Sequence, residues 1–151
     1  MAETIESLKS DTIVQFCVFV ENKVGRLNQL VRMLASLNVH ILAISTLDTC
    51  DCAVDRLIVD DPEKTRAHLN LNAFAFCEVE MVCVEMNDHA EMIEVLSTIS
   101  NAEINIGYVY PFISRPNGKC ALALNFDDND LAKKVLNRAG IKVLTQKDLT
   151  R

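Results

Sequence analysis

The sequence predicts an α+β fold in which one chain carries two ferredoxin-like βαββαβ modules, each with a four-stranded antiparallel sheet and both helices on one face. Three observations support this prediction. Strand-like and helix-like segments follow the same order twice, the second half repeats the apolar pattern of the first, and no linker rich in Gly, Pro or Ser separates the halves. The expected modules span residues 11–79 and 80–151.

The first module is expected to open with a strand and an amphipathic helix. Residues 13–20 are rich in β-branched and aromatic side chains, which is typical of a strand. A polar turn containing Gly25 follows, and Asn38 is a suitable stop for the next helix. Between them, apolar residues recur at the spacing of one helix face. These residues are Leu27, Leu30, Val31, Leu34 and Leu37.

Two strands, a helix and a further strand complete this module. The strands are expected at residues 39–47 and 52–59, and a helix follows from Asp61-Pro62 to about Asn72, with Asp as N-cap and Pro at the first helical position. Residues 74–86 then keep strand character for thirteen residues. This is ~43 Å at ~3.3 Å per residue, which is long for one strand. We therefore expect its first part to close one module and its second part to open the other.

The second module repeats this order. Asn87 or Asp88 is expected to cap its first helix, and the carboxylate of Glu91 can reach back as in a capping box. Strands are expected at residues 104–112, 119–126 and 141–144, the first two joined by a turn at Pro116-Asn117-Gly118. The last helix runs from Asp128 to Gly140.

A constant shift relates the two copies. At 65 residues, Asn22 falls on Asn87, and the apolar positions of the first helix fall on apolar positions of its counterpart. The shift becomes 67 where Asp60-Asp61 falls on Asp127-Asp128, and the two extra residues fit a longer turn at residues 116–118. The repeat predicts that both copies share one fold.

Both faces of the first strand are apolar. Val14, Phe16, Val18 and Val20 form one face, whereas Ile13, Cys17 and Phe19, interrupted only by Gln15, form the other. The helices cover one face, so the second is expected to pack on the other module or on a second chain, and we expect a homodimer. Tyr108 and Tyr110 share a face, where core or interface packing is a more common role than lining a pocket.

Composition excludes several classes of protein. The formal net charge is −6 and no basic cluster occurs, which argues against nucleic-acid binding. The start of the chain lacks signal-peptide features and no apolar run reaches the ~18 residues of a membrane span, so a cytoplasmic location is expected. Cys17, Cys77 and Cys83 lie in apolar runs and are interpreted as small core residues. Cys50-x-Cys52 lacks a second ligand pair, so neither a metal nor a cofactor is expected.

The turn between the first strand and helix resembles the ACT domain family. That family of regulatory modules usually carries Asn, a basic residue, Pro, Gly, any residue and Leu in this turn. Here Asn22, Lys23, Gly25 and Leu27 fit the pattern and Val24 replaces the Pro. Together with the element order, the chain looks like stand-alone tandem ACT proteins that bind amino acids.

The resemblance implies ligand contacts at the turn and at the start of the second strand. The implied residues in the first copy are Asn22, Lys23, Val24, Gly25, Arg26, Leu27, His40 and Ile41. Those in the second copy are Asn87, Asp88, His89, Ala90 and Asn105. Neither copy matches in full, because His40 replaces an Asn in one copy and Ala90 replaces the Gly in the other. The two copies therefore need not both bind, nor bind the same ligand.

The chemistry of this turn suits a zwitterionic ligand, although simpler roles remain open. Gly permits close approach to the backbone, free N–H groups at a helix start favour a carboxylate, and an amide both donates and accepts. Yet Asn22 also suits a plain turn, Gly25 is needed for the turn in any case, and His40 is equally explained as a histidine satisfied within the fold.

No catalytic constellation stands out in the sequence. It lacks a phosphate-binding Gly-rich loop, an H-E-x-x-H and a G-x-S-x-G motif, and its three histidines fall on different expected elements. We therefore expect a non-catalytic regulatory protein that binds a small molecule, an amino acid above all, and acts on a partner enzyme. The alternative is a dimerisation or interaction scaffold that regulates a partner without a ligand.

Overall fold

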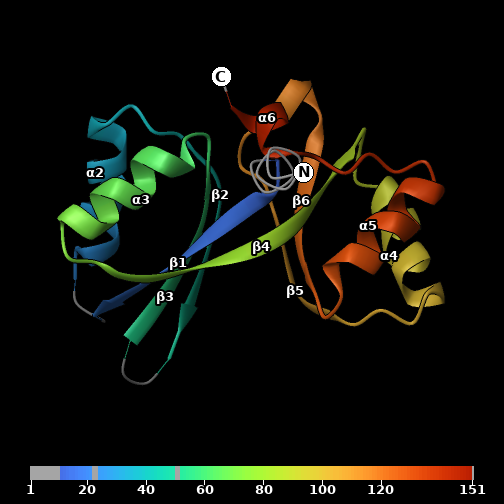
Figure 1. The fold of residues 1–151 in the computed structure, drawn as a ribbon, viewed down its shortest axis with the longest axis horizontal. Helices are drawn as coiled ribbons and strands as arrows, with labels where there is room; N and C mark the ends of the chain where they lie inside the picture. Colours follow the sequence, from blue (N-terminus) through green and yellow to red (C-terminus); the bar gives the residue numbers. More distant parts are fainter. Residues whose placement is uncertain (1–10, 22–23, 50–51, 151) are drawn as a thin grey trace, which may run out of the picture.

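The computed structural model describes residues 11–21, 24–49 and 52–150, in which six strands form one antiparallel sheet in the order β2-β3-β1-β4-β6-β5 (Figure 1). The first half contains β1 (Ile13–Glu21), α2 (Arg26–Ser36), β2 (Ile41–Asp48), β3 (Cys52–Val59) and α3 (Pro62–Leu71). The second half contains β4 (Ala75–Met86), α4 (Glu91–Asn101), β5 (Ile106–Pro111), a 3₁₀ turn at Pro116–Gly118, β6 (Cys120–Phe126), α5 (Asn129–Arg138) and α6 (Gln146–Leu149).

The long strand β4 belongs to both halves, as its length predicted. Its residues up to Met81, opposite Ile13, pair with β1. From Val82, opposite Leu124, they pair with β6. One continuous strand thus replaces a linker and fixes the two halves rigidly to each other. We call β1 to the first part of β4 module 1, and the second part of β4 onward module 2.

The prediction of a fourth strand in module 2, at residues 141–144, is wrong. Residues 141–144 form only an isolated bridge, between Val143 and Val84, so module 2 contributes three strands and module 1 contributes four, with β4 shared by both. Two residues later the chain turns into α6, where Thr145 and Asp148 form a reciprocal capping box. That box starts a helix before a strand can extend. The helix α6 was not among the elements predicted from the sequence.

The two edge strands bend toward each other and meet. Both β2 and β5 contain a register shift at the same repeat position, between Ile41 and Ala43 and between Ile106 and Tyr108. Such bulges bend a strand. Ala43 then bridges to Phe112, and the Ile113 amide donates to the carbonyl of Leu42 over 2.8 Å. The two edges of the sheet therefore meet between the modules.

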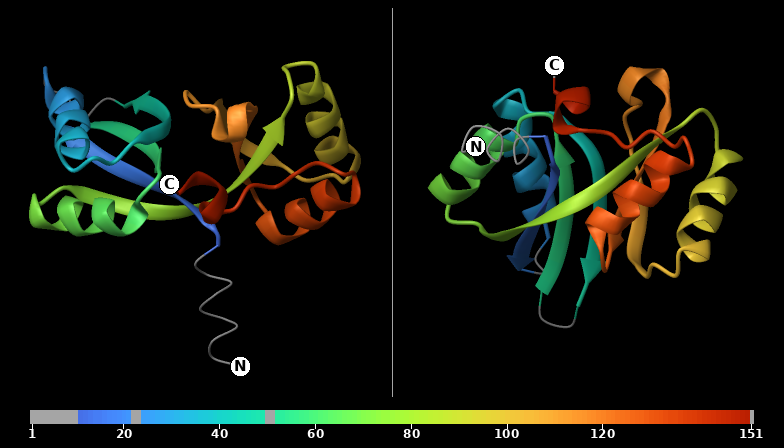
Figure 2. Two further views of the ribbon diagram at one scale, coloured as in Figure 1. Left: turned by 90° about the horizontal axis from the view of Figure 1, so that it is seen from above. Right: turned by 45° about the vertical axis from the view of Figure 1, so that its right-hand side comes forward.

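The helices cover the outside of this bent sheet. Figures 1 and 2 show α2 and α3 at one end of the molecule and α4 and α5 at the other. Each pair buries its own apolar cluster against the sheet. Asp61 and Asp128 cap α3 and α5 through the amides of Lys64 and Leu131, as predicted. None of the helices in the described residues is long and apolar enough to cross a membrane.

A third apolar cluster lies between the inner faces of the two modules. It contains Ile13, Ala43, Ile58, Met81, Cys83, Tyr110, Ala121, Ala123, Leu144 and Leu149, with Tyr108 and Phe112 packed against it. The second face of β1 thus packs on the other module, one of the two expected partners. Its outer end stays open, because Phe19 remains 43% exposed.

Candidate ligand site at the junction of the modules

The first turn of module 1 leads into α2, which has no side-chain cap among the residues that the structure describes. Gly25 adopts a left-handed conformation with φ 87° and precedes α2 without a side-chain cap. Val24 is fully exposed, and the Arg26 guanidinium donates to Gln29 Oε1 over 3.0 Å. Asn22 and Lys23 lie outside the described residues. The positive φ explains the glycine, since no atom would contact an added Cβ there.

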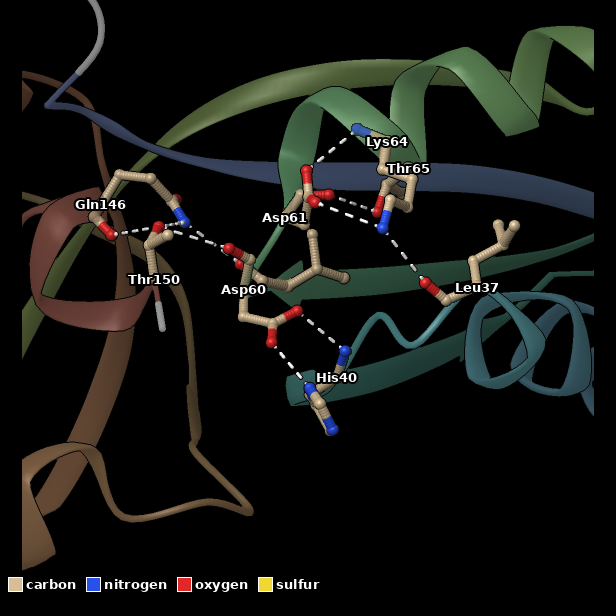
Figure 3. A network of polar contacts seen from close by, with 9 residues as sticks. Leu37, His40, Asp60, Asp61, Lys64, Thr65, Gln146 and Thr150 are labelled. Carbon is tan, nitrogen blue, oxygen red and sulfur yellow. Dashed lines mark hydrogen bonds and ion pairs between the residues drawn. The ribbon is translucent and has the colours of Figure 1, made fainter.

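His40 lies at the other end of α2 and is paired within the fold. Asp60 accepts the backbone amide of His40 on Oδ1 at 2.8 Å, and its Oδ2 lies 2.7 Å from Nδ1 of the ring (Figure 3). Module 2 repeats the arrangement, because Asn105 Nδ2 donates to Asp127 Oδ2 over 3.4 Å. Both residues therefore tie the start of one strand to the end of its neighbour, and neighbouring Ile41 packs against the core of module 1.

The first turn of module 2 is held by its own carboxylates. Asn87 donates to Glu91 from both its backbone amide, over 3.0 Å, and its side-chain Nδ2, over 2.8 Å. The amide of Ala90 donates to Asp88 Oδ1 over 2.8 Å. The reach of Glu91 back across the turn is as predicted, but the N-cap of α4 is Ala90 rather than Asn87 or Asp88. Hence the two Asn87 groups that could donate to a ligand carboxylate already donate to the carboxylate of Glu91.

The implied ligand residues of one module do not meet. Each first helix has 11 residues, so ~16 Å separates its turn from the following strand. In Figure 1 the start of β2 and the end of β4 lie on the upper side, whereas the end of β1 and the start of β5 lie on the lower side. The His40 region of module 1 therefore shares its side with residues 87–90 of module 2.

A cavity of about 330 Å³ lies beside this turn of module 2, between residues 86–92 and the segment that follows β5. Its apolar wall includes Met86, Met92, Phe112 and Leu122. Its polar groups come from His89, Ser114 and Arg115. The Ser114 hydroxyl is buried and has no hydrogen-bond partner among the described residues. Such an unsatisfied group is costly and is suited to receive a ligand.

The same segment touches a second cavity and both modules. Ser114 and Arg115 also line a cavity of about 230 Å³ together with Leu42 and the end of α6. The Ser114 amide, like that of Ile113, donates to the carbonyl of Leu42. In turn, α6 is tied to module 1, because Gln146 Nε2 donates to the Val59 carbonyl over 3.3 Å. A ligand bound in this region would therefore contact groups that are bonded to both modules.

Of the implied ligand residues that the structure describes, only His89 lines the 330 Å³ cavity. Ser114 and Arg115 were not among the residues predicted from the sequence, which placed only a longer turn at residues 116–118 next to them. Their signal was the insertion of two residues that changes the repeat shift from 65 to 67. Insertions in one copy of a repeat are frequent at functional loops.

Cysteine placement corrects one further expectation. Cys17 and Cys83 are buried as predicted, but Cys77 is exposed. Its strand lies beyond the part of the inner face that module 2 covers, so an apolar run did not guarantee burial. Among the residues that the structure describes, no cluster of three or more His, Cys, Asp or Glu is arranged to hold a metal ion. Cys50 lies outside them.

Comparison with known proteins gives a family match and several structural relatives. A family model described as an ACT domain pair matches residues 11–151. A protein of Bacteroides thetaiotaomicron is 27% identical, with a TM-score of 0.83 over 93% of this chain and 96% of its own. The ligand-free regulatory subunit of Thermus thermophilus aspartate kinase has 11% identity and a TM-score of 0.59, over 87% and 91% of the two chains. The search of curated proteins gave no match.

Proposed function

This chain belongs to the ACT domain pair family, and we propose that it is a non-catalytic regulatory protein that binds an amino acid at the first turns of its modules, near their junction. The proposed modules are residues 11–79 and 80–151. A structural relative is the regulatory subunit of an aspartate kinase, which supports a regulatory role. Under this proposal the protein acts on a partner enzyme in the cytoplasm.

The cavity beside the first turn of module 2 is the observation that carries the proposal. Its volume of about 330 Å³ is at the small end of the range for ligand pockets. Arg115 offers a guanidinium for a carboxylate, and the unpaired Ser114 hydroxyl offers a further hydrogen bond. The wall of Met86, Met92 and Leu122 favours a small or aliphatic side chain.

The first turn of module 1, residues 22–27, is the second proposed site. Because α2 begins without a side-chain cap among the described residues, its first amides are suited to a carboxylate. In module 2, α4 also begins without a side-chain cap among the described residues, but the two donors of Asn87 beside its start are already bonded to Glu91. The two turns are therefore expected to differ in affinity.

Thermal unfolding against a panel of amino acids at millimolar concentration tests the proposal. A ligand at 100 times its Kd stabilises the folded state by about 2.7 kcal/mol, enough to raise the Tm by several degrees. Arg115→Gln should remove most of this shift. The matched control is Arg138→Gln in the last turn of α5, outside the cavity lining, which should retain it.

A scaffold without a ligand is the second candidate, favoured by an open apolar row on module 1. Leu47, Val54, Phe19 and Ala75 lie side by side across four strands, where Phe19 is 43% and Leu47 46% exposed. Such a row suits the proposed homodimer. Two results together would favour the scaffold over the amino-acid-binding regulator. No amino acid would raise the Tm, and sedimentation would show a dimer that Phe19→Lys dissociates but Leu71→Lys does not.

A further inference from the structure

Two cysteines face each other across the first and fourth strands of the sheet. Cys17 of β1 and Cys77 of β4 are direct register partners in the antiparallel pair. Directly opposed residues project from the same face, with their Cα atoms ~4.5–5.5 Å apart. This separation lies within the ~4.4–6.8 Å range for disulfides. Both thiols are free.

The register selects this pair from the described cysteines. Cys83 lies opposite Ala123, Cys120 opposite Met86, and Cys52 opposite Glu21. A disulfide in the existing ladder thus has one available pairing among these five residues.

The surroundings of the two thiols give them different roles. Cys77 is exposed and open to a solute, whereas Cys17 is buried. Burial is the main cause that raises the pKa of Cys17, and contact with Cys77 raises it further. Gln15 Nε2 donates to Cys17 Sγ over 3.1 Å, which opposes that effect. Cys77 is therefore the thiol that meets an external disulfide first, and Cys17 is placed to act second.

We propose that Cys17 and Cys77 are a reversible modification site that forms an intramolecular disulfide by exchange with a small disulfide such as oxidised glutathione. The Cys77 thiolate attacks one sulfur of that disulfide and releases one thiol. The Cys17 thiolate then attacks the Cys77 sulfur of the mixed disulfide and releases the second. Overall, two protein thiols lose two electrons and two protons, and the external disulfide becomes two thiols.

Formation of the Cys17–Cys77 disulfide would affect contacts beyond β1 and β4. Gln15, which donates to Cys17 Sγ, also donates to the Tyr108 hydroxyl of module 2 over 2.9 Å. Arg56, the register partner of Cys17 on β3, stacks its guanidinium 3.7 Å from the centre of the Tyr108 ring. Oxidation is thus linked to the junction of the modules by two contacts. The inference rests on these strands and is independent of the proposed amino-acid site.

The test uses the full chain with Cys50, Cys52 and Cys120 replaced by serine, treated with oxidised glutathione, alkylated and analysed by intact mass and peptide mapping. The expected product has lost two hydrogens, joins the peptides that contain Cys17 and Cys77, and reverts with dithiothreitol. Adding Cys17→Ser should instead leave one glutathione bound to Cys77. Adding Cys77→Ser should leave Cys17 unmodified.

Three results would overturn the inference: no reaction of the parent protein, a persistent glutathione on Cys77 although Cys17 is present, or a disulfide that maps to another pair. Circular dichroism spectra and melting curves of each variant verify that it is folded. Cys17→Ala replaces Cys17→Ser if the serine variant unfolds, and should give the same trapped mixed disulfide.

Discussion

A single residue, Asp55, carries a conflict between charge and burial. It lies on β3 with no exposed surface. The Thr46 hydroxyl donates to its Oδ1 over 3.1 Å, while its Oδ2 is buried without a partner in the described part of the chain. Burial raises the pKa of this carboxyl above its ordinary value. The folded protein therefore holds the Asp55 proton more tightly than the unfolded chain does.

Asp55→Asn should consequently stabilise the protein at neutral pH. Because the folded pKa is raised, the wild type loses stability as pH rises from about 4 through that folded pKa, whereas the amide does not titrate. We expect a gain of about 1–3 kcal/mol at pH 7 that shrinks toward pH 4. Urea unfolding at several pH values measures it. Asp130→Asn, on the exposed start of α5, is the control, and an equal change in both variants would contradict the argument.

At the scale of elements, the four longer helices of the described chain end in the same way. The residue beyond each C-cap is left-handed: Asn38 after α2, Ala73 after α3, Glu103 after α4 and Gly140 after α5. An amide and a glycine tolerate this conformation, but alanine and glutamate pay a steric cost. The sequence predicted the ends of α2, α3 and α5, and at the first and last of these it carries the residue types that such ends favour.

Ala73→Gly should therefore stabilise the protein, although glycine usually destabilises. Relief of the strained φ of 57° is expected to contribute about 1 kcal/mol. The mirror variant Gly140→Ala, at φ 77°, should lose a similar amount. Chemical unfolding of both variants decides the matter. Opposite signs support the steric argument, whereas destabilisation by Ala73→Gly would show that chain entropy outweighs strain.

Local sequence patterns predicted most helices and strands, but they did not predict the contacts between elements that are distant in the sequence. Apart from the strand expected at residues 141–144 and the unexpected α6, strands and helices appeared within about two residues of expectation, because the apolar period, Asp61-Pro62 and Asp128 act locally. The shared strand followed from its length alone. By contrast, the cavity at Ser114 depends on where β5 meets β2, and the pairing of His40 depends on Asp60, twenty residues away. Neither contact leaves a periodic signal in the sequence.

At the scale of the whole molecule, one buried polar network crosses the apolar junction. Gln15 on β1 is fully buried, donates to the Tyr108 hydroxyl over 2.9 Å and accepts from the Tyr110 hydroxyl over 2.5 Å. The tyrosine rings stack with their centres 6.4 Å apart. Since apolar packing is not directional, this network adds directional contacts between the two modules that β4 already joins.

Gln15→Leu should lower the free energy of unfolding by more than the net contribution of the hydrogen bonds that it removes. The substitution leaves both tyrosine hydroxyls without their buried partner, at a cost of about 1–3 kcal/mol for each such group. Adding Tyr108→Phe and Tyr110→Phe should recover part of the loss, because replacing every polar partner removes the desolvation penalty. A mutant cycle of unfolding free energies measures this coupling. If the effects simply add, the network contributes nothing to holding the modules together beyond the shared strand β4 and the apolar cluster.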